Sequence, residues 1–319
     1  MNKLVAMRDA LLKNILEAMR EDENVYFVTA DFGSPILDHI RADFPNRFVN
    51  VGVAEQNLIN ISSGLALEGY TVFSYGIAPF ITMRCFEQLR VNLALLSEVR
   101  DINVNLIGVG AGYSYVVSGP THQCYEDISL IRSLPNFKLY SSSDQHIAGS
   151  FIDYCRQHKG PKYLRFDAQI LPELRQGINR NAMDDGFEIL RPGTDGVLIA
   201  TGYMTHTALA VAGHLSRQRD LMVIDLFNLT GYNQSKLLLV IDGQPAVFSL
   251  EEGFANRGGV DALIGELIKS SGTDTIFEGI GVRPGYSFDL GTRQELHEVV
   301  GIGQNAVTKR VEQTLISIS

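Results

Sequence analysis

A single carboxylate, Glu55, stands at the start of an apolar segment. The β-type run Phe48–Val51 and Gly52 precede it, and the apolar sequence LINISSGLALEGY begins at residue 58. An acid in this place suits general acid–base chemistry in a cleft. The alternative is structural, because an acid in the first turn of a helix is stabilised by the helix dipole. The local sequence leaves both interpretations open.

A histidine follows a turn in the sequence SGPTHQ, Ser118–Gln123. Gly119 and Pro120 fix the turn, and His122 stands directly before a helix-like stretch. An imidazole placed in this way can donate to an oxyanion or carry a proton near neutral pH. A purely structural histidine explains the local pattern equally well.

Aromatic and basic residues alternate in PFITMRCFEQLR, Pro79–Arg90. Phe80 stands at the expected start of a helix, and Arg84 and Phe86 follow. On local grounds the phenylalanines are core residues and the arginines form a solvated face. The glycines of GVGAG (108–112) do not complete a dinucleotide-binding pattern, because Tyr113 stands where the last glycine is required. A glycine-rich turn after a strand is the better interpretation.

Composition excludes several classes of protein. The 319 residues carry a formal charge of −9, which disfavours a nucleic-acid or anionic-membrane role. The three cysteines lack metal-binding spacing and indicate reduced thiols in a cytoplasmic protein. The amphipathic N-terminal stretch is charged throughout, so we expect neither a signal peptide nor a membrane span.

Short apolar runs alternate with helical patterns along the chain, which predicts an α/β fold with mainly parallel sheets flanked by helices. The expected strands are 25–30, 71–75, 103–110, 137–141, 162–166, 196–202, 221–227, 246–252 and 274–280. The expected helices are 4–20, 55–68, 80–97, 123–133, 144–158, 203–218, 258–270 and 304–317. A polar stretch without a clear period interrupts the alternation. We therefore expect a first domain at 1–170, a linker at 171–190 and a second, smaller α/β domain at 191–319.

The order of these motifs resembles the transketolase family. RFVNVGVAEQN, PFITMRCFEQLR and GPTHQ are similar to the segments of its pyrimidine-binding domain, and AMRDALLKNILEAM with Ala30 and Asp31 fits the start of that domain. LIATGYMTHTALAVAGHL and VFSLEEGFANRGGVDALI resemble its C-terminal domain. The spacing from Phe80 to Arg90 is most similar to split transketolases, which consist of two different chains.

The resemblance implies thiamine diphosphate as the cofactor. In this family the glutamate that matches Glu55 contacts ring atom N1′ of the aminopyrimidine and promotes the imino form that removes the C2 proton. Phe80 matches the ring that stacks on the aminopyrimidine. Asp31, Arg84 and Phe86 are expected as further neighbours of the cofactor.

Half of the family's cofactor site is missing from the sequence. The family holds the diphosphate and its Mg²⁺ or Ca²⁺ through a G-D-G motif followed by Asn, and this chain has no such motif. The resemblance therefore implies that an N-terminal, diphosphate-binding partner subunit supplies the metal ligands, and that this chain supplies none. We expect the chain to dimerise with itself and to form an α2β2 complex with that partner.

The substrate side departs from the family pattern. Ser118 replaces the usual aspartate before G-P-T-H-Q, and Gly110 stands where related enzymes carry a substrate-binding His or Arg. Tyr113 and Tyr115 lie between these positions and are expected to form part of a reshaped pocket wall. Arg8 and Arg165 match positions of phosphate-binding arginines. For both arginines, a structural ion pair is the alternative.

The resemblance thus implies a subunit of an enzyme that transfers a two-carbon ketol unit from a ketose to an aldose. Glu55 would activate the cofactor, and His122 would assist proton transfer or hold the donor oxygen. The altered positions predict a specialised sugar substrate. Two alternatives remain: a deoxyxylulose-phosphate-synthase-like or 2-oxo-acid condensation that uses pyruvate, and a non-catalytic scaffolding or regulatory paralogue. Retention of Glu55 disfavours the latter.

Overall fold

A computed structural model describes residues 4–178 and 180–318. The chain divides into two compact units. The first contains residues 4–111 and 130–177, and the second contains residues 112–129, 178 and 180–318. The segment that carries SGPTHQ thus belongs to the second unit, although it lies in the first half of the sequence. The predicted class, α/β with two mainly parallel sheets flanked by helices, is confirmed.

The first unit is built on a six-stranded parallel sheet with the order β2-β1-β3-β4-β6-β5. Its strands are β1 (Val25–Thr29), β2 (Phe48–Asn50), β3 (Thr71–Ile77), β4 (Asn103–Val109), β5 (Lys138–Ser141) and β6 (Gly160–Phe166). Most of their residues are buried, as expected for strands covered on both faces. Five of these strands overlap the predicted ranges, and β2 corresponds to the β-type run before Glu55.

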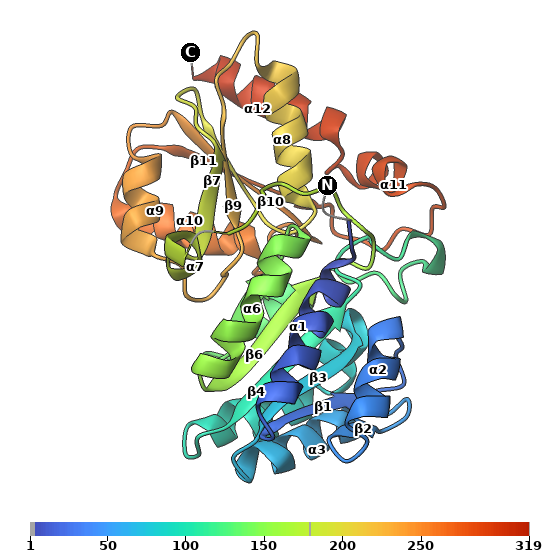
Figure 1. Cartoon of the computed structure of the whole chain (residues 1–319). Coiled ribbons are helices and arrows are strands. Elements are labelled where there is room, and N and C mark those ends of the chain that lie inside the picture. The colour runs from blue at the N-terminus through green and yellow to red at the C-terminus, as the bar shows by residue number, and fades with distance from the viewer. Residues whose placement is uncertain (1–3, 179, 319) are drawn as a thin grey trace. The chain divides into compact units, whose positions relative to one another are not determined.

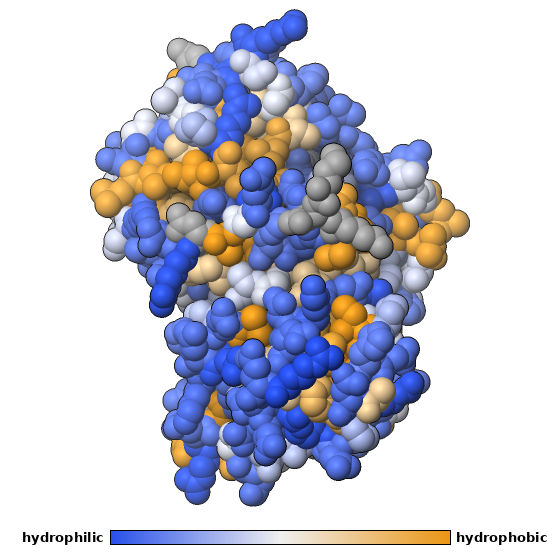
Figure 2. Space-filling model, in the orientation of Figure 1, coloured by the Kyte–Doolittle hydropathy of each residue, from blue (hydrophilic) through white to orange (hydrophobic). Residues whose placement is uncertain are grey.

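Helices α1 (Met7–Glu21) and α6 (Gln145–Gln157) pack against each other beside this sheet (Figure 1). Both helices bury one apolar side, and hydrophilic residues predominate on the outer face of this unit that Figure 2 shows. Helix α3 (Glu55–Leu67) contacts β1, β3 and β4. The sheet is thus covered by amphipathic helices, as the alternating sequence pattern predicts.

Two helical regions of this unit differ from the prediction. Helix α2 (Pro35–Asp43) was not predicted, and Ser34 caps it by accepting a hydrogen bond from the Ile36 N–H. The predicted helix 80–97 is a mixture of π-helical segments, η1 (Phe80–Arg84) and η2 (Leu89–Leu95), with a short α4 (Phe86–Gln88) between them.

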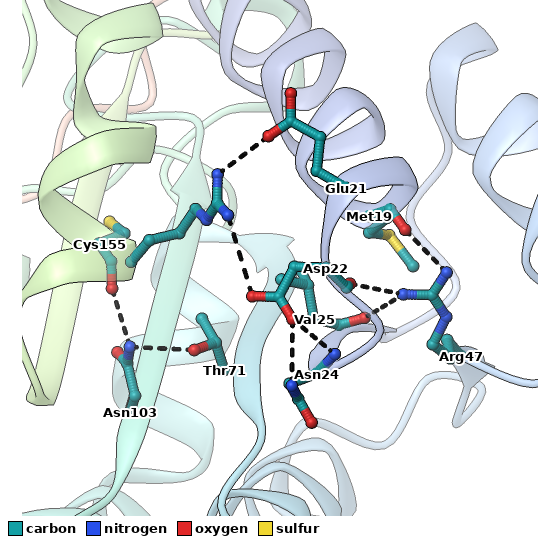
Figure 3. Close-up of polar contacts among 10 residues, drawn as sticks. Met19, Glu21, Asp22, Asn24, Val25, Arg47, Thr71, Asn103 and Cys155 are labelled. Atoms are coloured by element: carbon teal, nitrogen blue, oxygen red, sulfur yellow. Dashed lines mark hydrogen bonds and ion pairs between the residues drawn. The ribbon is translucent and has the colours of Figure 1, made fainter.

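A polar network holds the amino ends of the strands in this unit (Figure 3). Arg47 donates to the backbone carbonyls of Met19, Asp22 and Val25. Asn103, at the start of β4, donates to the Thr71 hydroxyl and to the Cys155 carbonyl. These contacts join the ends of α1 and α6 to the sheet and leave its opposite, carboxyl edge for a site.

The second unit has a five-stranded sheet with the order β11-β10-β8-β9-β7, in which β7 is antiparallel and the other strands are parallel. The strands are β7 (Phe187–Arg191), β8 (Val197–Ala200), β9 (Met222–Leu226), β10 (Ala246–Phe254) and β11 (Ile276–Val282). The helices include α8 (Met204–Leu215), α9 (Gln234–Ile241), α10 (Val260–Ser271), α11 (Arg293–Val300) and α12 (Gln304–Ser317). Of these elements, β7, α9 and α11 were not predicted from the sequence. The stretch expected as a linker, 171–190, contains α7 (Arg180–Asp185) and most of β7.

The segment 112–129 packs into the core of this second unit. Gly112 and Cys124 form an isolated antiparallel bridge, and the rings of Tyr113 and Tyr125 join a cluster of side chains from β8, β10, α8 and α12. The helix predicted at 123–133 is shorter in the structure, where α5 spans Asp127–Arg132.

Candidate functional site at the carboxyl edge of the first sheet

Glu55 is placed by a tight turn after β2. Gly52 has a φ of +74°, which favours glycine, and the Ala54 N–H donates to the Gly52 carbonyl at 2.7 Å. Glu55 is then the first residue of α3, and only 3% of its surface is exposed. A buried carboxylate at a helix start is unusual unless it has partners, because burial removes its hydration.

The partner of this carboxylate is Arg84. Its Nη1 donates to Glu55 Oε2 at 2.6 Å, and the arginine side chain itself is 44% exposed. The other carboxylate oxygen, Oε1, has no hydrogen-bond partner among residues 4–178 and 180–318. One oxygen of this acid is thus held by Arg84, and the other makes no hydrogen bond to the described residues.

Phe80 completes this cluster. The guanidinium carbon of Arg84 lies 4.5 Å from the centre of the Phe80 ring, a cation–π distance. Both residues belong to the π-helical segment η1, which follows β3 and brings them to the same edge of the sheet as Glu55. Phe86 opens α4 and is half-buried. The structure thus brings Glu55, Phe80 and Arg84 together and places Phe86 shortly after them in the next helical segment.

Cys85 lies beside this cluster and was not singled out from the sequence. Its thiol donates to the Ile81 carbonyl at 2.9 Å. Burial, together with the nearby Glu55 carboxylate, raises the pKa of the thiol to about 12. Cys85 is therefore a neutral thiol at physiological pH and not a nucleophile.

Asp31 lies just after β1 and is tied to Asn50 at the end of β2. The Asn50 side chain accepts from the Asp31 N–H at 3.1 Å and donates to the Asp31 carboxylate at 3.0 Å. The same Asn50 oxygen accepts from the Gly52 N–H, so it also fixes the turn that leads to Glu55. Asp31 adopts a positive φ of 52°, which aspartate tolerates better than most residues. The sequence signal for Asn50 was an amide at the carboxyl end of a strand.

A cavity of about 450 Å³ lies at this edge, lined by Arg8 and Asp31 among others. Arg8 Nε is 3.5 Å from the Asp9 carboxylate, and its guanidinium lies 5.9 Å from the Phe32 ring. Arg165 is different, because it is only 2% exposed and lies inside β6, in register with Gly108 on β4. The two arginines expected to bind an anion therefore differ in access: Arg8 faces a cavity and Arg165 is buried.

His122 and Ser118 belong to the second unit. His122 is half-buried, its Nδ1 lies 3.0 Å from the Thr121 hydroxyl, and its ring meets the Tyr115 ring edge-to-face at 6.2 Å. Ser118 is exposed at the end of a short 3₁₀ turn, and Gly119 follows with a φ of +68°. The turn thus presents a serine and a histidine on the surface of that unit.

Tyr113 was expected in a pocket wall, and the structure places it in a core instead. It is 1% exposed, and its ring lies 4.9 Å from that of Tyr125. Burial raises the pKa of its hydroxyl to about 12. Tyr115, the other tyrosine expected in the pocket wall, is half-buried and retains access.

Packing and backbone conformation explain why glycine stands at positions 108, 110 and 112 of GVGAG, without any role in binding a phosphate. A Cβ on Gly108 would lie less than 3.0 Å from the Tyr163 ring, and one on Gly112 would lie equally close to the Glu252 carboxylate. Gly110 adopts a φ of +107°, which strains any other residue. Close packing and backbone conformation thus account for all three glycines.

Neither a metal-binding cluster nor a membrane-spanning helix occurs in residues 4–178 and 180–318. No group of three or more His, Cys, Asp or Glu side chains there is arranged to hold a metal ion. None of the helices in these ranges has the length and apolar character needed to cross a membrane.

The chain is an α/β protein of two units with mainly parallel sheets. Glu55 and Phe80 lie at the carboxyl edge of the first sheet, the edge at which such folds usually bind ligands. The family model described as "Transketolase, pyrimidine binding domain" matches residues 3–173. The chain therefore belongs to the transketolase family and is a C-terminal subunit of that family. Membership implies a transferase and the use of thiamine diphosphate.

Relatives of two lengths match the chain. An apulose-4-phosphate transketolase subunit of Actinobacillus succinogenes is 28% identical over 304 residues, which cover 94% of this chain and 96% of that protein. The 1-deoxy-D-xylulose-5-phosphate synthase of Synechococcus sp. is 27% identical over 305 residues, which cover 94% of this chain but only 46% of the synthase. Among solved structures, a split-gene transketolase described as an inactive β4 tetramer matches with a TM-score of 0.85 and 25% identity, over 99% of this chain and 100% of that one.

Proposed function

We propose that this chain is the pyrimidine-binding and C-terminal subunit of a thiamine-diphosphate-dependent transketolase that transfers a two-carbon ketol unit from a ketose to an aldose. The observation that carries the proposal is the Glu55 carboxylate. Among the described residues it is nearly buried, is held through one oxygen by Arg84, and has no protein partner on the other. An acid that is mostly buried, paired on one oxygen and without a protein partner on the other is a candidate contact for a ligand.

The residues of this cluster suit an aminopyrimidine. Glu55 Oε1 can exchange a proton with a ring nitrogen, since it is an acceptor with no hydrogen-bond partner among the described residues. The Phe80 ring offers an aromatic face for stacking. Arg84 fixes the orientation of the carboxylate and contacts the same ring. Once bound, thiamine diphosphate supplies the electron sink that ketol transfer needs.

A partner chain would complete the site. The chain matches less than half of the single-chain synthase, and relatives of its own length include a protein named as a transketolase subunit. The sequence also lacks the G-D-G…N motif that binds the diphosphate and its metal. We therefore assign Mg²⁺ or Ca²⁺ ligation to an N-terminal partner subunit, in an α2β2 complex in which this chain also contacts its own copy.

The substrate is proposed to be a specialised sugar with an anionic end. Ser118 is shorter than the family's aspartate and carries no charge, so its hydrogen bonding to a common sugar hydroxyl differs from that of the aspartate. Arg8 faces a cavity at the carboxyl edge and can pair with a phosphate or carboxylate. His122, half-buried beside Tyr115, is proposed to hold the donor oxygen or carry its proton. A relative is named for apulose 4-phosphate, which supports an unusual sugar as the donor or acceptor in the reaction of this chain.

A panel assay of the reconstituted two-chain enzyme tests this function. We expect ketol transfer from a ketose phosphate, with kcat/KM higher for branched or deoxygenated aldoses than for ribose 5-phosphate and erythrose 4-phosphate. If the two common acceptors give the highest kcat/KM, the specialised-substrate proposal is wrong. If no ketose donor gives transfer, the ketol-transfer proposal itself is wrong.

One alternative reaction has specific support. The match to 1-deoxy-D-xylulose-5-phosphate synthase covers 94% of this chain. A subunit of that reaction would use pyruvate as the donor and release carbon dioxide. Replacing the ketose donor with pyruvate in the same assay separates the two, since only the synthase-like enzyme would then form product.

A further inference from the structure

We propose that the second unit carries a separate binding site for a neutral polyhydroxylated ligand, a sugar or sugar alcohol without a phosphate. The site is a cavity of about 440 Å³ lined by residues of α8, α11 and the first turn of α12; Figure 1 shows where these three helices lie. Its volume lies within the range of small-molecule pockets. None of its lining residues belongs to the Glu55 cluster, so this inference does not depend on the ketol-transfer chemistry.

The floor of the cavity rests on a buried charged group. Glu252, Arg293 and His297 are 2%, 3% and 2% exposed. Arg293 Nη2 donates to both carboxylate oxygens of Glu252 at 2.8 Å, and His297 Nε2 lies 2.8 Å from Glu252 Oε1. Because this ionised, arginine-bound carboxylate only accepts hydrogen bonds, Nε2 of His297 carries the proton.

The second ring nitrogen of His297 is left for a ligand. Within residues 4–178 and 180–318, Nδ1 of His297 has no hydrogen-bond partner, although the residue is only 2% exposed and lines the cavity. In the neutral ring with its proton on Nε2, Nδ1 is a hydrogen-bond acceptor. It therefore selects a ligand that offers a donor, such as a hydroxyl group.

The remaining polar groups favour a neutral ligand. The lining includes the side chains of Thr207, Gln294, Gln304 and Asn305, and among the described lining residues there is no Lys or Arg. The two lining acids already accept hydrogen bonds from backbone groups at helix starts. Glu298 accepts from the Asn305 and Ala306 N–H groups at 2.8 and 3.1 Å. Glu295 accepts from the Thr292 N–H at 2.8 Å. A phosphate would meet two carboxylates and, among the described lining residues, neither Lys nor Arg, so a phosphorylated sugar is disfavoured.

An aromatic wall completes the site. The Tyr203 ring lines the cavity and is held from two directions, with the Arg293 guanidinium 3.7 Å from its centre and the His297 ring edge-to-face at 5.3 Å. A ring fixed in this way is a rigid apolar surface for the C–H face of a sugar, while the amides and Nδ1 meet its hydroxyls.

Ligand-observed and histidine-detected NMR on the full chain tests the proposal, with D-xylose and ribitol as probes. We expect millimolar binding and a shift of the His297 ring resonances. The variants Gln294→Leu and Thr207→Val each remove one polar lining group and leave the buried residues Glu252, Arg293 and His297 unchanged. Each variant should weaken binding about fivefold. Gln218→Leu, an exposed position outside the cavity, is the matched control and should bind as wild type.

Three outcomes would overturn the inference. The His297 resonances could stay unmoved at saturating probe, the lining variants could bind as tightly as the control, or xylose 5-phosphate could shift His297 more strongly than xylose does. Each of these results would contradict a neutral sugar or polyol at this cavity, whatever the enzyme's reaction proves to be.

Discussion

At the scale of single residues, Glu55 shows how burial separates two explanations that the local sequence cannot. An acid that served only the helix dipole would lie on the surface of the first turn. Glu55 is 3% exposed, and it is paired with Arg84 on one oxygen only. The geometry therefore favours a chemical role, which substitution can test.

Replacing Glu55 with Gln keeps the shape of the side chain and removes its ionisable proton. In the reconstituted enzyme we expect exchange of the thiamine C2 proton to slow by about 10²–10⁴-fold, the usual effect of losing a positioned acid–base group. Glu87→Gln, at an exposed acid on α4, is the control and should leave the exchange rate unchanged. If the variant exchanges the C2 proton at the wild-type rate, Glu55 has only a structural role.

Lys162 gives a prediction about pH, because it is fully buried on β6. Burial lowers the pKa of its ammonium to about 8, against 10.5 for an ordinary lysine. Between these two values the unfolded chain binds more protons than the folded one, so this group makes the free energy of unfolding rise with pH. The penalty for a buried charge is fully present below pH 8.

The variant Lys162→Met should remove that dependence. From pH 8 to about pH 9.5, wild type should gain about 1–2 kcal/mol of stability relative to the variant. Urea unfolding of both proteins across this window measures the difference. Parallel curves for the two proteins would show that the ammonium is not desolvated as the structure indicates.

At the scale of elements, the sequence predicted most strands and missed the elements whose signals are short. Buried parallel strands such as β8 are continuous apolar runs, which are easy to recognise. Helices α2 and α11 went unpredicted, although Ser34–Pro35 and the capping box of Thr292 and Glu295 are start signals for them. The π-helical character of 80–84 has no sequence signature, yet it sets how Phe80 and Arg84 approach Glu55.

The site itself was predictable only in part. Resemblance pointed to Glu55, Phe80 and Arg84, and the structure brings these three together. The resemblance could not indicate that Tyr113 enters a core. The residues that bury Tyr113 belong to β10 and α11, which lie far along the sequence. The same long-range packing explains Gly112, whose missing side chain leaves room for the Glu252 carboxylate.

Gly112→Ala should therefore destabilise the second unit. The new Cβ would lie less than 3.0 Å from the Glu252 carboxylate, and a φ of +54° is strained for alanine. Since the carboxylate is locked by Arg293 and His297, relief requires breaking a buried ion pair, at a cost on the order of 3 kcal/mol. Gly213→Ala, on α8 with open space around it, is the control and should be neutral or slightly stabilising. Equal melting temperatures of the two variants would contradict this account.

At the scale of the whole molecule, the chain corresponds to 46% of a single-chain synthase, while it matches nearly all of a protein named as a transketolase subunit. In the proposed function Glu55 and Phe80 contact the aminopyrimidine, whereas the sequence has no motif for the diphosphate. Most of the binding energy for a charged cofactor should come from that missing half, through its metal and its phosphate contacts.

We therefore expect the purified chain to dimerise and to bind thiamine diphosphate at least about 100-fold more weakly than the two-chain complex does. Addition of the N-terminal partner should produce an α2β2 particle and make binding depend on Mg²⁺ or Ca²⁺. Native mass spectrometry measures the stoichiometry, and calorimetry with and without EDTA measures the affinity and its metal dependence. The Glu55→Gln variant should still assemble, because glutamine keeps the shape of the side chain and can still accept the hydrogen bond from Arg84. Tight, metal-dependent binding by this chain alone would mean that its own residues hold the diphosphate, and the split-site proposal would then be wrong.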